Sequence, residues 1–175
     1  RRFVQFFILT ALLAPAPVFA AGEDTPAQEV TTAIPKGSGL PVPRFVSLKS
    51  GKVHARTGPA LRYPVRWVYQ RPGLPVEVIQ EFDVWRKIRD RDGAEGWVNQ
   101  ILIDGRRTAI IEGEELVAAR RQDSEKSKIA ARFEPGVIVQ LRQCLPEQCE
   151  VSAGGYRGWV PRKFLWGLYR GELLD

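Results

Sequence analysis

Short apolar runs alternate with polar positions through most of the chain, and turn residues interrupt them every few positions. A period of two is typical of strands, and the Gly, Pro and Asp-Gly positions between the runs are typical of turns. Asp92-Gly93 is the clearest hairpin signal. The predicted strands are Phe45–Leu48, Val53–Arg56, Trp67–Tyr69, Pro75–Phe82, Trp85–Arg89, Gly96–Asn99 and Thr108–Ile111, with a helical turn at Ile101–Ile103. This pattern predicts an all-β protein of small β-barrels.

One phrase of this pattern occurs twice. Residues 85–98 read WRKIRDRDGAEGWV and residues 149–160 read CEVSAGGYRGWV, with Gly96 and Gly158 62 positions apart. That distance suits two tandem copies of a small domain, at residues 44–111 and 112–175, with Thr108–Ile111 closing the first. Further correspondences are Leu116–Arg120 with 52–56, Gly136–Leu141 with 74–79, and Phe164–Leu165 with 102–103. For residues 112–128 the repeat favours a strand and a loop, with a partial helix as the alternative.

The start of the chain is typical of an exported protein. Arg1-Arg2 precede an apolar run from Phe3 to Leu13, and Ala20 ends a short segment of small residues. This pattern predicts a signal peptide at residues 1–20, by the general or the twin-arginine route; a buried core helix is the alternative. The apolar run is too short for a permanent membrane span. Residues 21–43 are rich in proline and without aromatic residues, which predicts a disordered linker.

The net charge is mildly positive, at +6 for the chain and +4 without the two N-terminal arginines. Such a surplus suits a surface that meets anionic material of the cell envelope. Nucleic acid is a poorer interpretation, because an exported protein rarely meets it and the basic residues are spread along the chain. We therefore expect a periplasmic or otherwise exported protein that binds no nucleic acid and keeps no membrane span after signal cleavage.

The two cysteines, Cys144 and Cys149, flank a four-residue loop. In an oxidising compartment this spacing predicts a disulfide across a hairpin, which would fix the register of its strands. A reactive or metal-binding pair is the alternative, with His54 as the only histidine of the chain. We expect no metal and no cofactor, because these three residues are a poor ligand set.

Several of these segments together resemble a bacterial SH3-like domain. They are residues 53–59, 63–65, 67–68, 76–79, 85–88 and 96–98, and the second copy resembles the divergent partner found in exported proteins with two such domains. The resemblance implies two tandem barrels of five to seven strands, packed together because the joint at Glu112–Glu115 is short. Two positions depart from the family pattern, with His54 in place of Asn and Gln148 in place of Trp.

The resemblance implies a binding module and not an enzyme, since no residues remain for a separate catalytic domain. Wall peptides, including peptidoglycan, are the implied ligand. An envelope scaffold that contacts another protein through an exposed tail at Phe164–Tyr169 is the alternative. Aromatic side chains beside a cation are good ligand contacts. The candidate binding residues are Arg56, Tyr63, Trp67, Tyr69, Trp85 and Trp97. The tryptophans could instead fill the core, and Arg56 could hold the adjacent loop through its carbonyls.

Overall fold

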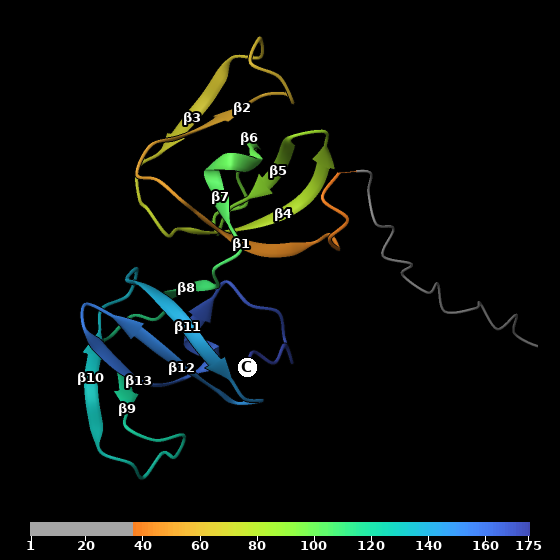
Figure 1. The fold of residues 1–175 in the computed structure, drawn as a ribbon. Coiled ribbons are helices and arrows are strands. Elements are labelled where there is room, and N and C mark those ends of the chain that lie inside the picture. The colour runs from red at the N-terminus through yellow and green to blue at the C-terminus, as the bar shows by residue number, and fades with distance from the viewer. Residues whose placement is uncertain (1–36) are drawn as a thin grey trace, which may run out of the picture. The chain divides into compact units, whose positions relative to one another are not determined.

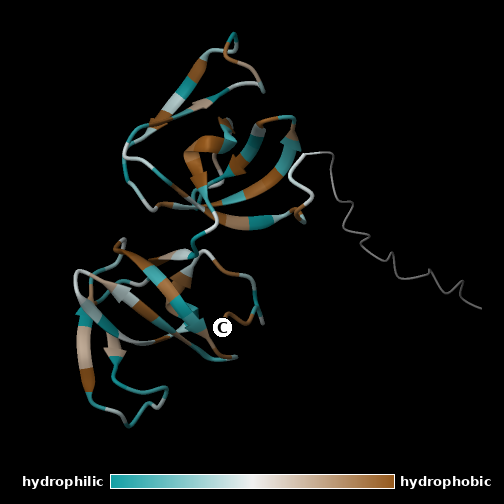
Figure 2. Cartoon of the chain, viewed as in Figure 1, coloured by the Kyte–Doolittle hydropathy of each residue, from teal (hydrophilic) through white to brown (hydrophobic). Residues whose placement is uncertain are grey.

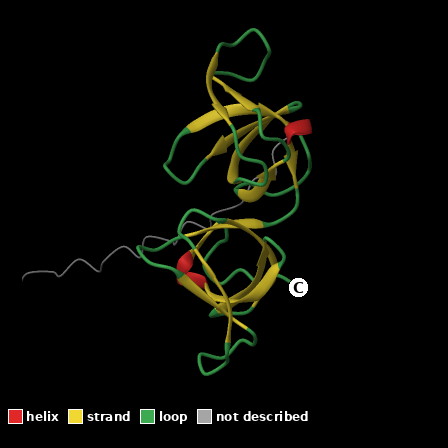
Figure 3. Cartoon of the chain, turned by 90° about the vertical axis from the view of Figure 1, so that its left-hand side faces the viewer, coloured by secondary structure: helices red, strands yellow, loops and turns green. Residues whose placement is uncertain are grey.

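The computed structural model describes residues 37–175, and this part of the chain is all-β (Figures 1 and 3). The elements are β1 (Arg44–Leu48), β2 (Val53–Arg56), β3 (Val65–Tyr69), β4 (Pro75–Phe82), β5 (Trp85–Arg89), β6 (Glu95–Asn99), η1 (Gln100–Leu102), β7 (Ile103–Asp104), β8 (Thr108–Ile111), β9 (Val117–Arg120), β10 (Ile129–Phe133), β11 (Ile138–Cys144), β12 (Gln148–Ala153), β13 (Tyr156–Pro161), η2 (Arg162–Phe164) and β14 (Leu165–Trp166). Within the described residues no helix is long and apolar enough to cross a membrane.

The strands form two seven-stranded sheets with the same topology. Their orders are β3-β2-β6-β5-β4-β1-β7 and β10-β9-β13-β12-β11-β8-β14, so each strand of the first has a counterpart seven strands later. We call the first sheet domain 1 and the second domain 2. The tandem repeat predicted from the sequence is therefore confirmed. Each sheet ends in two edge strands, β3 and β7 or β10 and β14, so neither closes fully into a barrel.

The repeated Gly-Trp-Val phrase has a steric cause. A Cβ atom added to Gly96 would lie 2.9 Å from the Cβ atom of Ala55, and one added to Gly158 would lie 2.9 Å from the carbonyl oxygen of Arg120. At both places two antiparallel neighbouring strands lie very close to each other, β6 beside β2 and β13 beside β9. Only glycine allows the two backbones this close approach, so the same residue occurs at the same point of both sheets.

Each domain has its own core, built from the inward positions of its strands. Buried and partly buried residues alternate along β2 and β9, as expected for a strand with one face on the core. The two clusters of apolar residues are Val46, Leu48, Val53, Ala55, Val76, Val78, Ile88 and Val98 in domain 1, and Ala109, Ile111, Val117, Ala119, Phe133, Val139, Leu141, Cys144, Cys149, Val151, Val160 and Leu165 in domain 2. Brown and teal positions in Figure 2 show the same alternation along the strands.

Two expectations about local structure are confirmed. Cys144 and Cys149 form a disulfide, and they are register partners at the end of the β11–β12 hairpin. Residues 112–128 contain β9 and a loop, so the helical alternative is wrong. The turn at Asp83 joins β4 and β5 with a φ of 50°, a conformation that Asp tolerates better than most residues.

One strand lies in a different sheet from the one expected. The sequence predicts that Thr108–Ile111 closes the first copy, but this strand is β8, which pairs with β11 and β14 of domain 2. The corresponding role in domain 1 belongs to β1, which pairs with β4 and β7. The repeat therefore begins with this strand in both copies, and each sheet ends in the two-residue strand that follows its 3-10 helix.

The signal peptide predicted at residues 1–20 lies outside the described residues, as does the linker up to residue 36. The last part of that linker contacts domain 1. Ser38 donates a backbone and a side-chain hydrogen bond to the Glu81 carboxylate, both 2.8 Å long. Val42 packs against the core of domain 1.

The tail after β14 is partly buried, so the exposed tail expected from the sequence is wrong. Residues 37–175 belong to one compact unit. Within it, the rings of Trp166 and Tyr169 lie 5.3 Å and 4.9 Å from the ring of Phe45. The Tyr169 hydroxyl donates to Glu77 at 2.8 Å. The tail thus finds aromatic and carboxylate partners on β1 and β4, which leaves its rings little free surface.

Candidate functional site

A shallow pocket of about 410 Å³ lies on domain 1, and we call it groove 1. Its wall is one face of β2, because Val53 and Ala55 point into the core and leave His54 and Arg56 on the other side. The start of β5, the end of β6 and η1 complete it. The lining residues are Lys52, His54, Arg56, Leu61, Trp85, Asn99, Ile101 and Leu102.

Groove 1 offers apolar surface to a ligand. Leu61 and Ile101 are 75% and 69% exposed, more than any other large apolar residue of residues 37–175, while Trp85 is buried. Exposed apolar residues that border one concavity are typical of an interaction site. The rim of the groove is therefore made of Leu61 and Ile101, and Trp85 supports it from below.

Both rim residues are held in place by hydrogen bonds. The Nη1 atom of Arg56 donates to the carbonyl oxygens of Leu61 and Tyr63, at 3.1 and 2.8 Å, and so fixes the loop that carries Leu61. Asn99 caps η1 by accepting a hydrogen bond from the backbone N–H of Ile101 at 3.1 Å. Arg56 thus has the loop-holding contacts that the sequence left open as an alternative.

The six candidate binding residues do not form one site. Arg56 and Trp85 line groove 1. The Tyr63 ring lies against Gly58, where an added Cβ would come within 2.7 Å of the ring, and the Arg62 guanidinium lies 5.1 Å from its centroid. Trp97 is half-buried on β6, with Arg56 and Lys87 as its register partners.

Trp67 and Tyr69 form a separate aromatic pair on β3. Their rings meet edge to face at 6.4 Å, and both pack against the core of domain 1. The Tyr69 hydroxyl donates to Asp90 at 3.0 Å. Burial, followed by the neighbouring Asp90 carboxylate, raises the pKa of Tyr69 well above its ordinary value. This pair therefore lines a different part of domain 1 from groove 1.

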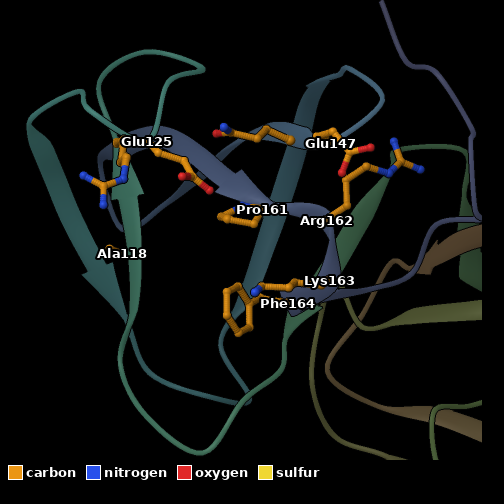
Figure 4. A pocket seen from close by; sticks show the side chains of 9 residues that line it. Ala118, Glu125, Glu147, Pro161, Arg162, Lys163 and Phe164 are labelled. Atoms are coloured by element: carbon orange, nitrogen blue, oxygen red, sulfur yellow. The ribbon is translucent and has the colours of Figure 1, made fainter.

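Domain 2 has a larger pocket of about 600 Å³ at the equivalent place, which we call groove 2. Its lining residues come from β9, the following loop, the start of β12, the end of β13 and η2. They are Ala118, Arg120, Glu125, Glu147, Gln148, Pro161, Arg162, Lys163 and Phe164. Figure 4 shows Glu125 and Glu147 on opposite sides of Pro161 in this view. The pocket is therefore bordered by charged side chains.

Two arginines of groove 2 already bind backbone carbonyls. The Nη1 atom of Arg120 donates to Ser127 at 2.8 Å, which parallels the contact of Arg56 in domain 1. Arg162 donates to the carbonyl oxygens of Leu145, Tyr169 and Glu172. The Lys163 ammonium lies 5.0 Å from the Phe164 ring centroid.

The two sheets with equivalent grooves correspond to the two matches of one family. The sequence model of the bacterial SH3 domain matches residues 49–105 and again residues 113–167, which together make up more than half of the chain. The chain belongs to the bacterial SH3 domain family. Both matches contain the 3-10 helix and the strands that build a groove. No curated protein sequence matches this chain.

Solved structures similar to these tandem bacterial SH3 domains include two from Trichomonas vaginalis. The structure of NlpC2 is 13% identical, with a TM-score of 0.34, over 76% of this chain and 50% of its own. The structure of NlpC1 is 11% identical, with a TM-score of 0.33, over 76% of this chain and 48% of its own. The chain thus spans about half the length of these proteins.

The sequence reasoning missed Lys52, Leu61, Asn99 and Ile101 as parts of a site on the first bacterial SH3 domain. It treated aromatic residues as ligand contacts, whereas the free apolar surface belongs to aliphatic residues in a loop and a 3-10 helix. Alignment of the two copies could have revealed this site, because Leu61 and Ile101 align with the charged residues Glu125 and Lys163 of the second copy. An apolar residue at a position where the other copy has a charge is expected to be exposed.

Proposed function

We propose that this protein is a non-catalytic binding module of the cell envelope, and that groove 1 binds a peptide of the wall, including peptidoglycan stem peptides. Bacterial SH3 domains commonly bind cell-wall peptides, and the chain carries two of them. The single observation that carries the proposal is the exposed apolar rim of groove 1, at Leu61 and Ile101.

The geometry of the rim supports binding of a ligand without large rearrangement. Leu61 is held through its carbonyl by Arg56, and Ile101 through its backbone N–H by Asn99. A backbone that is held in place before binding loses less conformational entropy on association. A short peptide laid across groove 1 would cover both aliphatic side chains.

The state of the cysteines supports a binding role over catalysis. Both cysteines of the sequence lie in the Cys144–Cys149 disulfide, so neither offers the free thiolate that a Cys-His nucleophile needs. The disulfide also fits an oxidising compartment. This bond, together with the signal peptide predicted at residues 1–20, supports a periplasmic or otherwise exported location.

Retention on purified peptidoglycan tests the proposal. We expect the protein to sediment with the insoluble wall, and the Leu61→Asp/Ile101→Asp variant to lose about tenfold in affinity because charged groups replace the apolar rim. The matched control is Tyr156→Asp/Leu173→Asp, which changes two residues of domain 2, each 61% exposed. It should bind as the natural chain does.

Three results would contradict the proposal. Passage of the natural protein without retention would remove the wall ligand and favour the scaffold alternative. Release of soluble wall fragments, followed by mass spectrometry of the supernatant, would show catalysis. Equal retention of the two double variants would move the site away from groove 1.

A further inference from the structure

Grooves 1 and 2 are built at equivalent places, which makes them a comparison within one chain. Each uses the strand β2 or β9, the loop after it, the start of β5 or β12, and the 3-10 helix η1 or η2. Each loop is held by an arginine on that strand, Arg56 or Arg120. The two linings therefore present different side chains from the same fold.

Three positions change character between the grooves. Leu61 corresponds to Glu125 in the loop, and Trp85 corresponds to Gln148 at the start of the next hairpin strand. The middle residue of the 3-10 helix is Ile101 in domain 1 and Lys163 in domain 2. Apolar groups in groove 1 are thus replaced by an acid, an amide and an ammonium group in groove 2. An apolar ligand group would have to desolvate these polar groups without a partner for them.

The charges of the grooves differ as well. Groove 1 is lined by the cationic Lys52 and Arg56 and by no carboxylate, whereas groove 2 carries Glu125 and Glu147 beside its cations Arg120, Arg162 and Lys163. Lys52 is exposed and forms no salt bridge within residues 37–175. Its ammonium group is therefore available to a negatively charged ligand group next to the apolar rim. Complementary charge of this kind selects one partner over another more than it adds affinity.

We propose that groove 1 alone takes the wall peptide, that it selects an apolar side chain beside a free carboxylate, and that Leu61, Trp85 and Ile101 make this choice. The inference rests on the proposed function and deepens it. The apolar side chain covers Leu61 and Ile101 above Trp85, and the carboxylate pairs with Lys52. Glu125 in groove 2 would repel the same carboxylate.

Calorimetric titration with soluble muropeptides, released from peptidoglycan by cleavage of its glycan chains, measures both stoichiometry and charge dependence. We expect one muropeptide per chain. Converting the muropeptide carboxylates to amides should weaken binding about tenfold. Lys52→Gln should weaken binding of the acidic form to a similar extent. It should leave binding of the amidated form unchanged, because that form has no carboxylate to pair with Lys52. Lys49→Gln, on an exposed lysine outside groove 1, is the matched control.

Transfer of the three residues tests whether they make the choice. The variant Glu125→Leu/Gln148→Trp/Lys163→Ile should bind a second muropeptide in its amidated form, because Leu116 stands at the place of Lys52 and gives a carboxylate no partner. The reciprocal variant Leu61→Glu/Ile101→Lys keeps the buried Trp85. Its affinity for the muropeptide in groove 1 should fall about tenfold or more. The reciprocal variant decides the matter if circular dichroism shows that the triple variant does not fold.

The outcomes separate this inference from the proposed function. Absence of binding to any wall fragment would contradict the proposed function, and this inference with it. Binding of two muropeptides by the natural chain, or equal binding of the amidated form, would overturn the inference and leave the proposed function standing. A folded triple variant that still binds one amidated muropeptide would show that these residues do not make the choice.

Discussion

The two domains fix the same hairpin by different chemistry. In domain 1, Glu81 of β4 and Arg86 of β5 are register partners and form a salt bridge with an Nε–Oε1 distance of 3.0 Å. In domain 2, the corresponding register partners on β11 and β12 are Cys144 and Cys149, joined by the disulfide. Both pairs are five residues apart and buried. One position of the fold thus carries an ion pair in one copy and a covalent bond in the other.

The ion pair needs many supporting contacts because a buried charge must be fully hydrogen-bonded. Arg44 donates to Glu81 at 2.6 Å, and the backbone N–H of Ser38 donates at 2.8 Å. Arg86 donates to Gln100 and to the carbonyl oxygens of Asp83 and Trp85. The network therefore ties the segment before β1, the hairpin turn and η1 to one point.

The disulfide requires no such support. Cys144 and Cys149 pack in the apolar core of domain 2, and the backbone of Cys144 pairs with Leu174 near the end of the chain. The hairpin is thus fixed at this position in both domains, and the ion pair fixes it only with its network intact. Loss of one partner should therefore cost more in domain 1 than loss of the covalent bond costs in domain 2.

The largest effect is expected from Glu81→Ala. It leaves Arg86 buried without its counter-ion, and breaking a buried pair in this way costs about 3–5 kcal/mol. Such a loss is comparable to the whole stability of many small domains. Hydrogen–deuterium exchange in urea, followed separately in the strands of both domains, should show early unfolding of domain 1.

The control variant replaces both charges at once. Glu81→Leu/Arg86→Met removes the buried charges together and should recover most of the lost stability, as apolar replacements of buried ion pairs generally do. If the double variant were as unstable as Glu81→Ala, the hairpin would depend on shape rather than on charge balance, and the comparison with the disulfide would fail.

A smaller effect is expected when the disulfide is removed. Cys144→Ala/Cys149→Ala opens a loop of only a few residues, for which the loss of chain entropy predicts roughly 2 kcal/mol. The loss should be confined to domain 2 in the same exchange experiment. Reduction of the natural chain should give a similar result.

Glu114→Ala/Asp123→Ala is the matched control, because it changes two exposed residues of domain 2 outside the hairpin. It should leave the exchange rates of both domains as they are in the natural chain. A loss of protection in domain 1 upon reduction would show that the disulfide stabilises more than its own hairpin.

Most of the fold could be predicted because local signals agreed with each other. The bounds of Pro75–Phe82 and Trp85–Arg89 follow from alternation and from the turn at Asp83, and the structure has the same bounds. The assignment of Thr108–Ile111 failed because a run of four residues, the last three of them apolar, fits either sheet. Its partners, β11 and β14, are chosen by long-range pairing that no local pattern records.

The grooves could be predicted only in part. Trp85 and Arg56 stood out by residue type, but Leu61 and Ile101 have ordinary side chains whose exposure depends on the Arg56 and Asn99 contacts. The Glu81–Arg86 pair was equally hidden, since a charged pair on a strand normally indicates a solvated face. Alignment of the two copies could have revealed it, because Glu81 and Arg86 stand at the positions of Cys144 and Cys149. A buried disulfide in one copy indicates that the same positions are buried in the other.

The smallest effect is expected from lowering the pH. Acid should weaken the ion pair of domain 1 but leave the disulfide of domain 2 intact. Burial alone would raise the pKa of Glu81, but hydrogen bonds from Ser38 and Arg44 outweigh it and hold that pKa below its ordinary value of 4.5. A carboxyl with a lowered pKa in the folded state stabilises the fold above its ordinary pKa, and this stability is lost as the pH falls through the folded value. The β4–β5 hairpin should therefore lose protection below about pH 4.5.

The disulfide does not titrate, so protection of the β11–β12 hairpin should change less over the same range. Domain 2 has its own acid-sensitive contact in Glu172, for which burial also opposes hydrogen bonds from Arg107 and Tyr169 that lower its pKa. That contact lies in the tail, so Glu172→Gln should remove the acid response there and leave the β4–β5 hairpin sensitive. Glu81→Leu/Arg86→Met, which removes the titrating carboxyl together with its counter-ion, should abolish the response of the β4–β5 hairpin alone. Equal acid sensitivity of both hairpins in the Glu172→Gln variant would mean that charge at Glu81 is not what holds the first one.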